Sequence, residues 1–232
     1  PTIGEVKYRD CIIEQLYNTV KSKIRYVTVH TGLGGFQPHD VDYILAQKQG
    51  DCKDMANLMC QSLRHAGIEA DLAISSTLVH RYLMDFPTLC SGNHMICVTK
   101  DKAGNQLFLD PTETQGVYYH PSRQIQGTSV FIFGEGKGYF LDVPTVTTEE
   151  NRNSLRYDLT LDDKKLVGHF SYEFNSIGAI QVKTWYNEYD RTRFNTAFTS
   201  FLNQISPRIN YKDFEVEDTE NSITVSGSIE IP

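Results

Sequence analysis

Three residues whose side chains can together carry out nucleophilic acyl transfer occur in the order Cys52, His94 and Asp110. A cysteine thiolate attacks a carbonyl carbon, and a histidine beside it takes up a proton and returns it to the leaving group. A carboxylate behind the histidine fixes its tautomer and supports the imidazolium. Such a triad works only if the fold brings the three side chains together. The helices and strands that carry these residues therefore determine whether the triad can form.

Cys52 is expected in the first turn of an amphipathic helix that ends near Gly67. Asp51 is a suitable N-cap. One helical face is formed by Met55, Leu58, Met59, Ser62, Leu63 and Ala66. Unpaired N–H groups and the helix dipole favour a thiolate at such a helix start, and they can stabilise an oxyanion beside the sulfur. A buried helix cysteine without chemistry is the simpler interpretation of this position alone.

His94 and Asp110 are expected on the two strands of a β-hairpin. Residues 94–99 and 106–109 have strand composition, and Asp-Lys-Ala-Gly-Asn at 101–105 has turn chemistry. A turn near residue 103 places His94 opposite residues 110–113. Each residue also has a plainer interpretation, because His94 can be a satisfied polar residue at a strand end and Asp110 can simply open an Asp-Pro turn.

These segments resemble the bacterial transglutaminase-like superfamily, in a branch found in large proteins with flanking β-rich domains. Residues 49–56, Gln-Gly-Asp-Cys-Lys-Asp-Met-Ala, are similar to the nucleophile segment of that family. The other similar segments, within a resemblance that covers about residues 5–145, are 24–27, 34–38, 66–68, 93–98 and 107–112. The motifs occur in the family's order, which makes the resemblance specific for the fold and less so for the substrate.

The resemblance implies an α+β, papain-like core in which the helix that carries the cysteine packs on an antiparallel sheet. A change of composition near residues 144–148 predicts a boundary between a catalytic core, 1–147, and a smaller α+β domain, 148–232. We expect this second, β-rich accessory domain to contain one helix, at about 179–205, and to be truncated at its C-terminus.

The resemblance further implies cysteine-dependent acyl transfer at a peptide or carboxamide bond through a thioester on Cys52. His94 is then the general base and acid, and Asp110 orients it. We expect hydrolysis by a protease or amidase, with a protein-glutamine transglutaminase or a non-catalytic scaffold module as the alternatives. Gln37 is a candidate donor to the oxyanion, although a solvated loop glutamine is its simpler interpretation.

Composition and cysteine usage limit the partners. The 232 residues have a net charge of −7, which disfavours nucleic acid, and no apolar run approaches the roughly 18 residues of a membrane span. The resemblance implies a peptide or protein substrate and neighbouring domains of a longer chain as the partners. Cys90, His94 and Cys97 lack a fourth zinc ligand, so neither a metal nor an organic cofactor is expected.

The compartment is left open by the sequence. Five cysteines are an odd number and too few for a disulfide framework at this length. The chain begins with Pro1 and has no signal-like apolar segment, so we expect an excised fragment. An extracytoplasmic location, periplasmic or at the cell surface, is the expectation for a bacterial multidomain member of this family.

Overall fold

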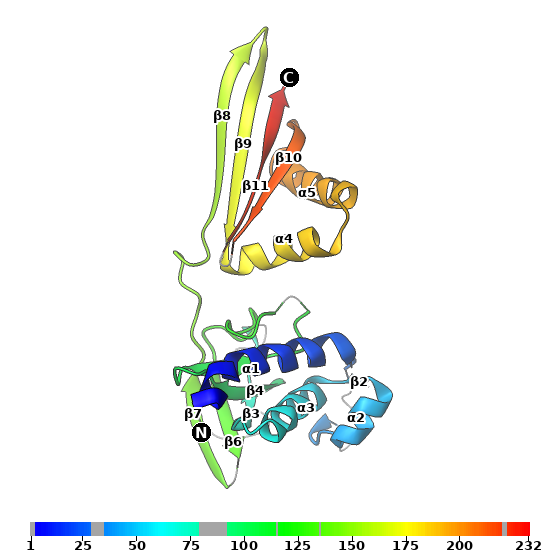
Figure 1. Ribbon diagram of the computed structural model, residues 1–232, viewed down its shortest axis with the longest axis vertical. Helices are drawn as coiled ribbons and strands as arrows, with labels where there is room; N and C mark the ends of the chain where they lie inside the picture. The colour runs from blue at the N-terminus through cyan, green and yellow to red at the C-terminus, as the bar shows by residue number, and fades with distance from the viewer. Residues whose placement is uncertain (1–2, 29–34, 79–91, 115, 135, 220–221) are drawn as a thin grey trace. The chain divides into compact units, whose positions relative to one another are not determined.

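The computed structural model describes residues 3–28, 35–78, 92–114, 116–134, 136–219 and 222–232. The chain forms two compact units, Pro1–Thr145 and Val146–Pro232, which are coloured from blue to green and from green to red in Figure 1. Within the described residues, no helix combines the length and the apolar character that crossing a membrane requires. Helices and antiparallel sheets occur together, which confirms the predicted α+β class.

The first unit combines helices with a five-stranded antiparallel sheet in the described residues, in the order β5-β4-β3-β6-β7. Its helices are α1 (Ile3–Lys23), α2 (Val41–Gln47) and α3 (Cys52–His65). The strands of the sheet are β3 (Ala70–Ser75), β4 (His94–Lys100), β5 (Gln106–Leu109), β6 (Ser129–Gly134) and β7 (Lys137–Asp142). Two further short strands, β1 (Arg25–Tyr26) and β2 (Gln49–Gly50), pair in parallel.

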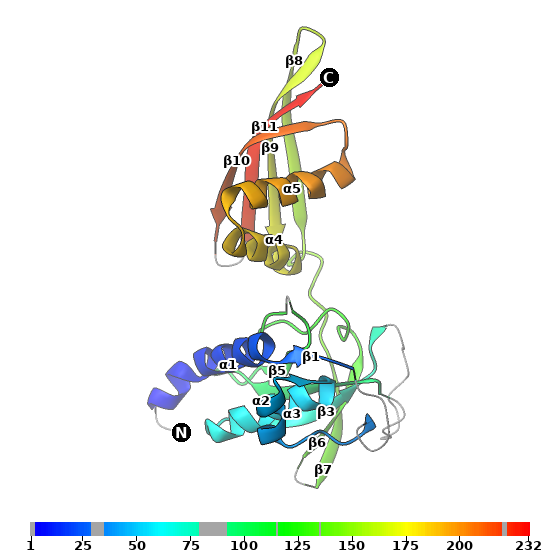
Figure 2. The ribbon, with the colours of Figure 1, turned by 90° about the vertical axis from the view of Figure 1, so that its right-hand side faces the viewer.

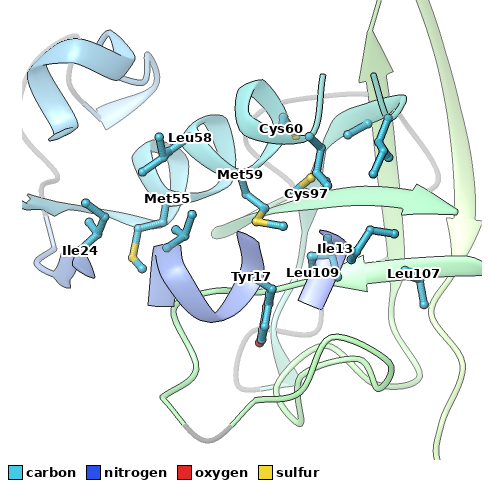
Figure 3. Close-up of a cluster of buried hydrophobic side chains, with 14 of the residues drawn as sticks. Ile13, Tyr17, Ile24, Met55, Leu58, Met59, Cys60, Cys97, Leu107 and Leu109 are labelled. Carbon is cyan, nitrogen blue, oxygen red and sulfur yellow. The ribbon is translucent and has the colours of Figure 1, made fainter. Parts of the chain in front are cut away.

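α3 packs its apolar face between α1 and the sheet (Figure 3). Met55 and Met59 of α3 and Ile13 and Tyr17 of α1 are each at most 1% exposed and share one cluster with Leu109 of β5. Burying a side chain of this size contributes roughly 1.5–3 kcal/mol. The helix ends as the sequence predicts, because Gly67 follows it with a φ of +76° that favours glycine. This packing fixes the direction of α3 and therefore the place of its N-terminus.

β4 and β5 form the predicted hairpin, with Cys97 opposite Leu109 and Lys100 opposite Gln106. The turn closes because the Asp101 carboxylate accepts hydrogen bonds from the N–H groups of residues 103 and 105, each at 2.8 Å. β4 also pairs with β3, where Ser75 lies opposite His94. His94 therefore stands at the start of an inner strand, one strand away from the end of β5, where Asp110 follows.

The second unit is an antiparallel sheet in the order β10-β11-β9-β8 with two helices packed on it (Figure 2). Its elements are β8 (Asn153–Asp162), β9 (Lys165–Asn175), α4 (Ser176–Glu188), α5 (Arg191–Ile205), β10 (Asn210–Asp218) and β11 (Ser222–Ile231). An aromatic core that includes Phe170, Phe174 and Phe198 joins helices and sheet.

The single helix expected at about 179–205 is wrong, because the structure has α4 and α5 there. The backbone of Tyr189 is extended, which ends α4. Asp190 then begins a new helix, since its carboxylate accepts a hydrogen bond from the N–H of Arg193 at 2.9 Å. Apolar residues recur at helical spacing on both sides of Tyr189, so the sequence pattern does not show the break between the two helices.

Tyr17 ties α1 to the segment that carries the candidate carboxylate. Its hydroxyl, buried in the core, donates to the backbone carbonyl of Asp110 at 2.9 Å. We predict that Tyr17→Phe lowers the free energy of unfolding by about 1–3 kcal/mol, because the carbonyl loses its buried partner. Urea unfolding followed by far-UV circular dichroism measures this change. An unchanged free energy of unfolding would contradict a stabilising role of the Tyr17–Asp110 hydrogen bond.

Candidate active site

Cys52 is the first residue of α3, and its side chain is half-buried. Asp51 caps the helix as predicted, and its carboxylate accepts the N–H groups of Lys53 at 2.9 Å and Asp54 at 3.2 Å. The N–H of Met55 bonds to the Asp51 carbonyl. Among the described residues, the N–H of Cys52 is therefore the first-turn donor without a described acceptor. It is the one positioned to meet an oxygen bound beside the sulfur.

A buried ion pair flanks the nucleophile position. The Lys53 ammonium is hydrogen-bonded to the Asp51 carboxylate, and the two residues are only 6% and 3% exposed. An unpaired carboxylate next to the sulfur would oppose a negative charge there, and the ammonium offsets it. Lys53 is therefore a buried, paired residue next to Cys52 in the chain.

The loop before α2 is tied to the same helix turn. The Asp54 carboxylate accepts the N–H of Asp51 at 3.2 Å and the N–H of His39 at 2.8 Å. The Nδ1 atom of His39 also lies 3.1 Å from both Asp54 oxygens. Gly50 allows the close approach of β2 to this turn, since a Cβ there would lie 2.6 Å from the Cβ of Asp54. One carboxylate thus joins the helix cap to His39 of the 35–40 loop.

Two of the three predicted side chains are in direct contact. Nε2 of His94 lies 2.9 Å from Oδ2 of Asp110, and Cys52 is near enough to His94 to contribute to the raised pKa of the imidazole. Because Nε2 is engaged by the carboxylate, Nδ1 is the ring nitrogen left for another partner. His94 and Asp110 are 7% and 1% exposed, so their charges interact in a largely water-free environment.

Asp110 is held by more than the histidine. Its Oδ2 also accepts from the Ser122 hydroxyl at 2.6 Å and the Gln124 amide at 2.9 Å. Its Oδ1 accepts the N–H and hydroxyl of Thr112, at 3.2 and 2.6 Å. The Thr112 contacts are those of the Asp-Pro turn considered from the sequence, so Asp110 both opens a turn and orients His94.

These contacts set the charges of the pair. Burial alone would lower the pKa of His94, but the charge and hydrogen bond of Asp110, together with Cys52, raise that pKa to about 10. Burial alone would raise the pKa of Asp110, but the charge and hydrogen bond of His94 and the hydroxyls of Ser122 and Thr112 hold it well below its usual range. The arrangement favours an imidazolium between a carboxylate and a sulfur.

The other residues considered from the sequence do not join this pair. Gln37 is exposed in the turn that follows residue 34. Cys90 lies outside the described residues. Cys97 is fully buried on β4, and burial followed by its hydrogen bond to Cys60 raises the pKa of its thiol. Within the described ranges, no group of three or more His, Cys, Asp or Glu side chains has the arrangement of a metal site.

Sequence reasoning missed Ser122 and Gln124, the two partners of Asp110 that lie in an irregular segment. No motif marks them, because their spacing from Asp110 reflects only the path of that segment. It also missed the contact between His39 and Asp54. The sequence offers a weak indication of the role of Asp54, since an acidic residue three positions after an N-cap is a common capping partner. Nothing in the sequence identifies His39 as its second hydrogen-bond partner.

Residues 2–96 match the family model described as the transglutaminase-like superfamily. These residues lie in the first unit, which is thus similar to that superfamily over residues 2–96. This confirms the predicted resemblance, and the match includes Cys52 and His94 but ends before Asp110. No curated protein matches the chain.

Two solved structures are similar to the chain at low identity. Calcium-bound LapG of Legionella pneumophila is 14% identical, with a TM-score of 0.43 over 60% of this chain and 72% of that one. A candidate protease from Parabacteroides distasonis is 9% identical, with a TM-score of 0.44 over 98% of this chain and 49% of that one. The present chain thus spans about half of the second structure.

The His94–Asp110 pair predicts a pH-dependent contribution to stability. The raised pKa of His94, about 10, makes its contribution complete below pH 6.5 and lost as the pH rises through 10. The lowered pKa of Asp110 makes its contribution complete above about pH 4 and lost in stronger acid. We therefore expect the wild-type advantage over Asp110→Asn to be largest at about pH 4–6.5 and to shrink toward pH 10. Urea unfolding at pH 5.5, 7.5 and 9.5 measures it, and a constant difference would contradict the pair.

Ser122 supplies a buried donor to the same carboxylate, so its removal leaves a charged acceptor less satisfied. We predict that Ser122→Ala lowers the free energy of unfolding by about 1.5–3 kcal/mol. Ser129→Ala is the matched control, because the Ser129 hydroxyl bonds to the exposed Asp142, and its effect should stay within about 0.5 kcal/mol. Equal losses in the free energy of unfolding for the two variants would show that the Ser122–Asp110 hydrogen bond adds no stability.

Proposed function

We propose that the first unit catalyses acyl transfer at a peptide or carboxamide bond, with Cys52 as nucleophile and water as the final acceptor. The observation that carries this proposal is the buried His94–Asp110 pair, whose carboxylate also accepts from Ser122 and Gln124 and whose imidazole has a pKa raised in part by Cys52. A purely structural histidine at a strand start does not need a buried carboxylate that is itself held by several further donors.

The chemistry follows from this geometry. The Cys52 sulfur attacks the carbonyl carbon, the carbon–sulfur bond forms, and the carbonyl electron pair moves to oxygen. When the oxygen pair returns, the carbon–nitrogen bond breaks and His94 gives its proton to the leaving amine. His94 then takes a proton from the incoming water, which displaces the sulfur and restores the starting charges. Asp110 stays ionised throughout and keeps Nε2 of His94 as a donor.

Protein-glutamine transglutamination differs only in the last acceptor, because an amine then resolves the thioester in place of water. The same triad serves both outcomes, so the identity of the acceptor needs its own measurement. Gln37 remains a candidate donor to the oxyanion. An extracytoplasmic location and attachment to further domains remain predictions drawn from the family resemblance.

A peptide mixture prepared from a proteome tests the proposal without a known substrate. The protein is incubated with the mixture and a fluorescent primary amine, and mass spectrometry reads new termini, deamidated glutamine or amine-modified glutamine. We expect hydrolytic products, and Cys52→Ala should reduce them by at least about 10³-fold because no other group replaces the nucleophile.

Cys11→Ala is the matched control, since Cys11 lies exposed on α1. It should leave the product yield unchanged. If amine-modified glutamine is the main product, the activity is that of a transglutaminase and not that of a hydrolase. Equal yields from wild type and Cys52→Ala would contradict the nucleophile and favour the scaffold alternative.

A further inference from the structure

The sheet of the second unit has two edges, β8 and β10, that pair on one side only among the described residues. An edge strand presents backbone N–H and C=O groups to which another strand can bind, and bulges or charged side chains commonly protect such edges. β10 has this protection, because its register with β11 shifts between Lys212 and Glu215 and Asp213 has a φ of +54°. A regular ladder along β10 is therefore disfavoured.

β8 lacks these protections. Its 10 residues pair with β9 in unbroken register from Asn153 to Asp162, and a typical strand has only about five or six. The strand contains neither lysine nor proline, and none of its residues has a positive φ. β8 is the outermost strand of the sheet on its side (Figure 1). The second unit thus has one protected edge and one long, regular edge that is open to pairing.

The tight turn after β8 determines which backbone groups face the open edge. Asp163 and Lys164 have φ values of +37° and +72°, as a type I′ hairpin turn requires. The residues that close this turn, Asp162 and Lys165, are paired, and a β-turn hydrogen bond joins such positions. Hydrogen-bonded pairs alternate along an antiparallel ladder. The even-numbered residues of β8 therefore bond to β9, and the odd-numbered ones direct their N–H and C=O groups outward.

The charges of β8 are complementary to those of a second β8 that runs antiparallel to it. When a two-fold axis passes through Tyr157, odd-numbered residues pair with odd-numbered ones, Arg156 faces the partner's Asp158, and Arg152 faces the partner's Asp162. Moving the axis by one residue would instead place Arg156 or Asp158 opposite its own copy. Within one chain Arg156 and Asp158 form an ion pair at 2.9 Å, and their side chains are 74% and 64% exposed. Both are thus accessible to a partner.

The apolar side chains of β8 match in the same register. Leu155 and Tyr157 pack against the aromatic core of the second unit, and the side chains of Leu159 and Leu161 project from the same face because strand side chains alternate. Leu159 and Leu161 are 38% and 75% exposed. Leu159 would lie directly opposite the partner's Leu155, and Leu161 diagonally across from it. Such cross-strand pairs stabilise a sheet.

We propose that β8 is a self-association surface, at which two copies of this chain pair their β8 strands antiparallel about Tyr157. The two four-stranded sheets then become one continuous sheet. A second copy is the partner that fits, because β8 read in the reverse direction supplies an opposite charge for each of its own charges. This inference does not depend on the proposed acyl-transfer activity.

Sedimentation velocity of the whole chain over a dilution series tests the proposal. We expect the wild type to form a species with twice the mass of a single chain. Asp158→Arg places arginine opposite Arg156 of the partner subunit, and Arg156→Asp places aspartate opposite the partner's Asp158. Each change should raise the dissociation constant of the dimer at least about tenfold. The two changes shift the net charge in opposite directions, so a loss common to both does not come from net charge.

Mixing the two single variants makes the test specific for this register. Each arginine then faces an aspartate again, so a dimer with one chain of each variant should form with an affinity close to that of the wild type. The double variant Arg156→Asp/Asp158→Arg should also dimerise. Glu217→Arg, a charge reversal at an exposed position of β10, is the matched control and should leave the dissociation constant within about twofold of wild type.

Four results would overturn the proposal. The first is a wild-type protein that stays monomeric up to about 100 µM. The second is a wild-type dimer that neither single variant weakens, since another surface would then form it. The third is a loss in both variants without recovery on mixing, because the two charges would not face each other. The fourth is dissociation by Glu217→Arg beside normal single variants of β8, which would assign the contact to β10.

Discussion

The buried ion pair between His94 and Asp110 is the interaction on which the geometry of the first unit depends. Two charges that are 7% and 1% exposed have lost most of their hydration, which costs several kcal/mol for each ion in a protein interior. Such a pair persists only if its remaining donors and acceptors are satisfied. Thr112, Ser122 and Gln124 satisfy the carboxylate. The segment after β5 has to fold back onto the end of its own strand to supply them.

The nucleophile is positioned by a second, similar arrangement at the start of α3. Asp51 and Asp54 cap the helix reciprocally, while Lys53 pairs with Asp51 and His39 lies against Asp54. These contacts fix the first turn but also occupy most of its donors. Among the described contacts, the N–H of Cys52 is the one first-turn donor left without an acceptor.

The elements that follow a local rule could be predicted from the sequence. Apolar spacing identified α3, Asp51 and Gly67 marked its ends, and turn chemistry at 101–105 identified the β4–β5 hairpin. Contacts between segments that lie far apart in the chain could not be predicted, since Ser122 and Gln124 have ordinary loop composition. The break between α4 and α5 was missed for a related reason, because Tyr189 and Asp190 continue the apolar and polar pattern of a single helix.

The rate at which iodoacetamide alkylates Cys52 in the wild-type protein, measured from pH 5.5 to 8.5, tests most directly whether the sulfur and His94 form a reactive pair. Cys11, exposed on α1, is the internal reference in each sample. An ordinary thiol has a pKa of about 8.5 and loses about tenfold in rate for each unit of pH below it. A sulfur paired with the His94 imidazolium should react at a nearly constant rate over this range, while Cys11 slows. A Cys52 rate that falls in parallel with that of Cys11 would contradict the account.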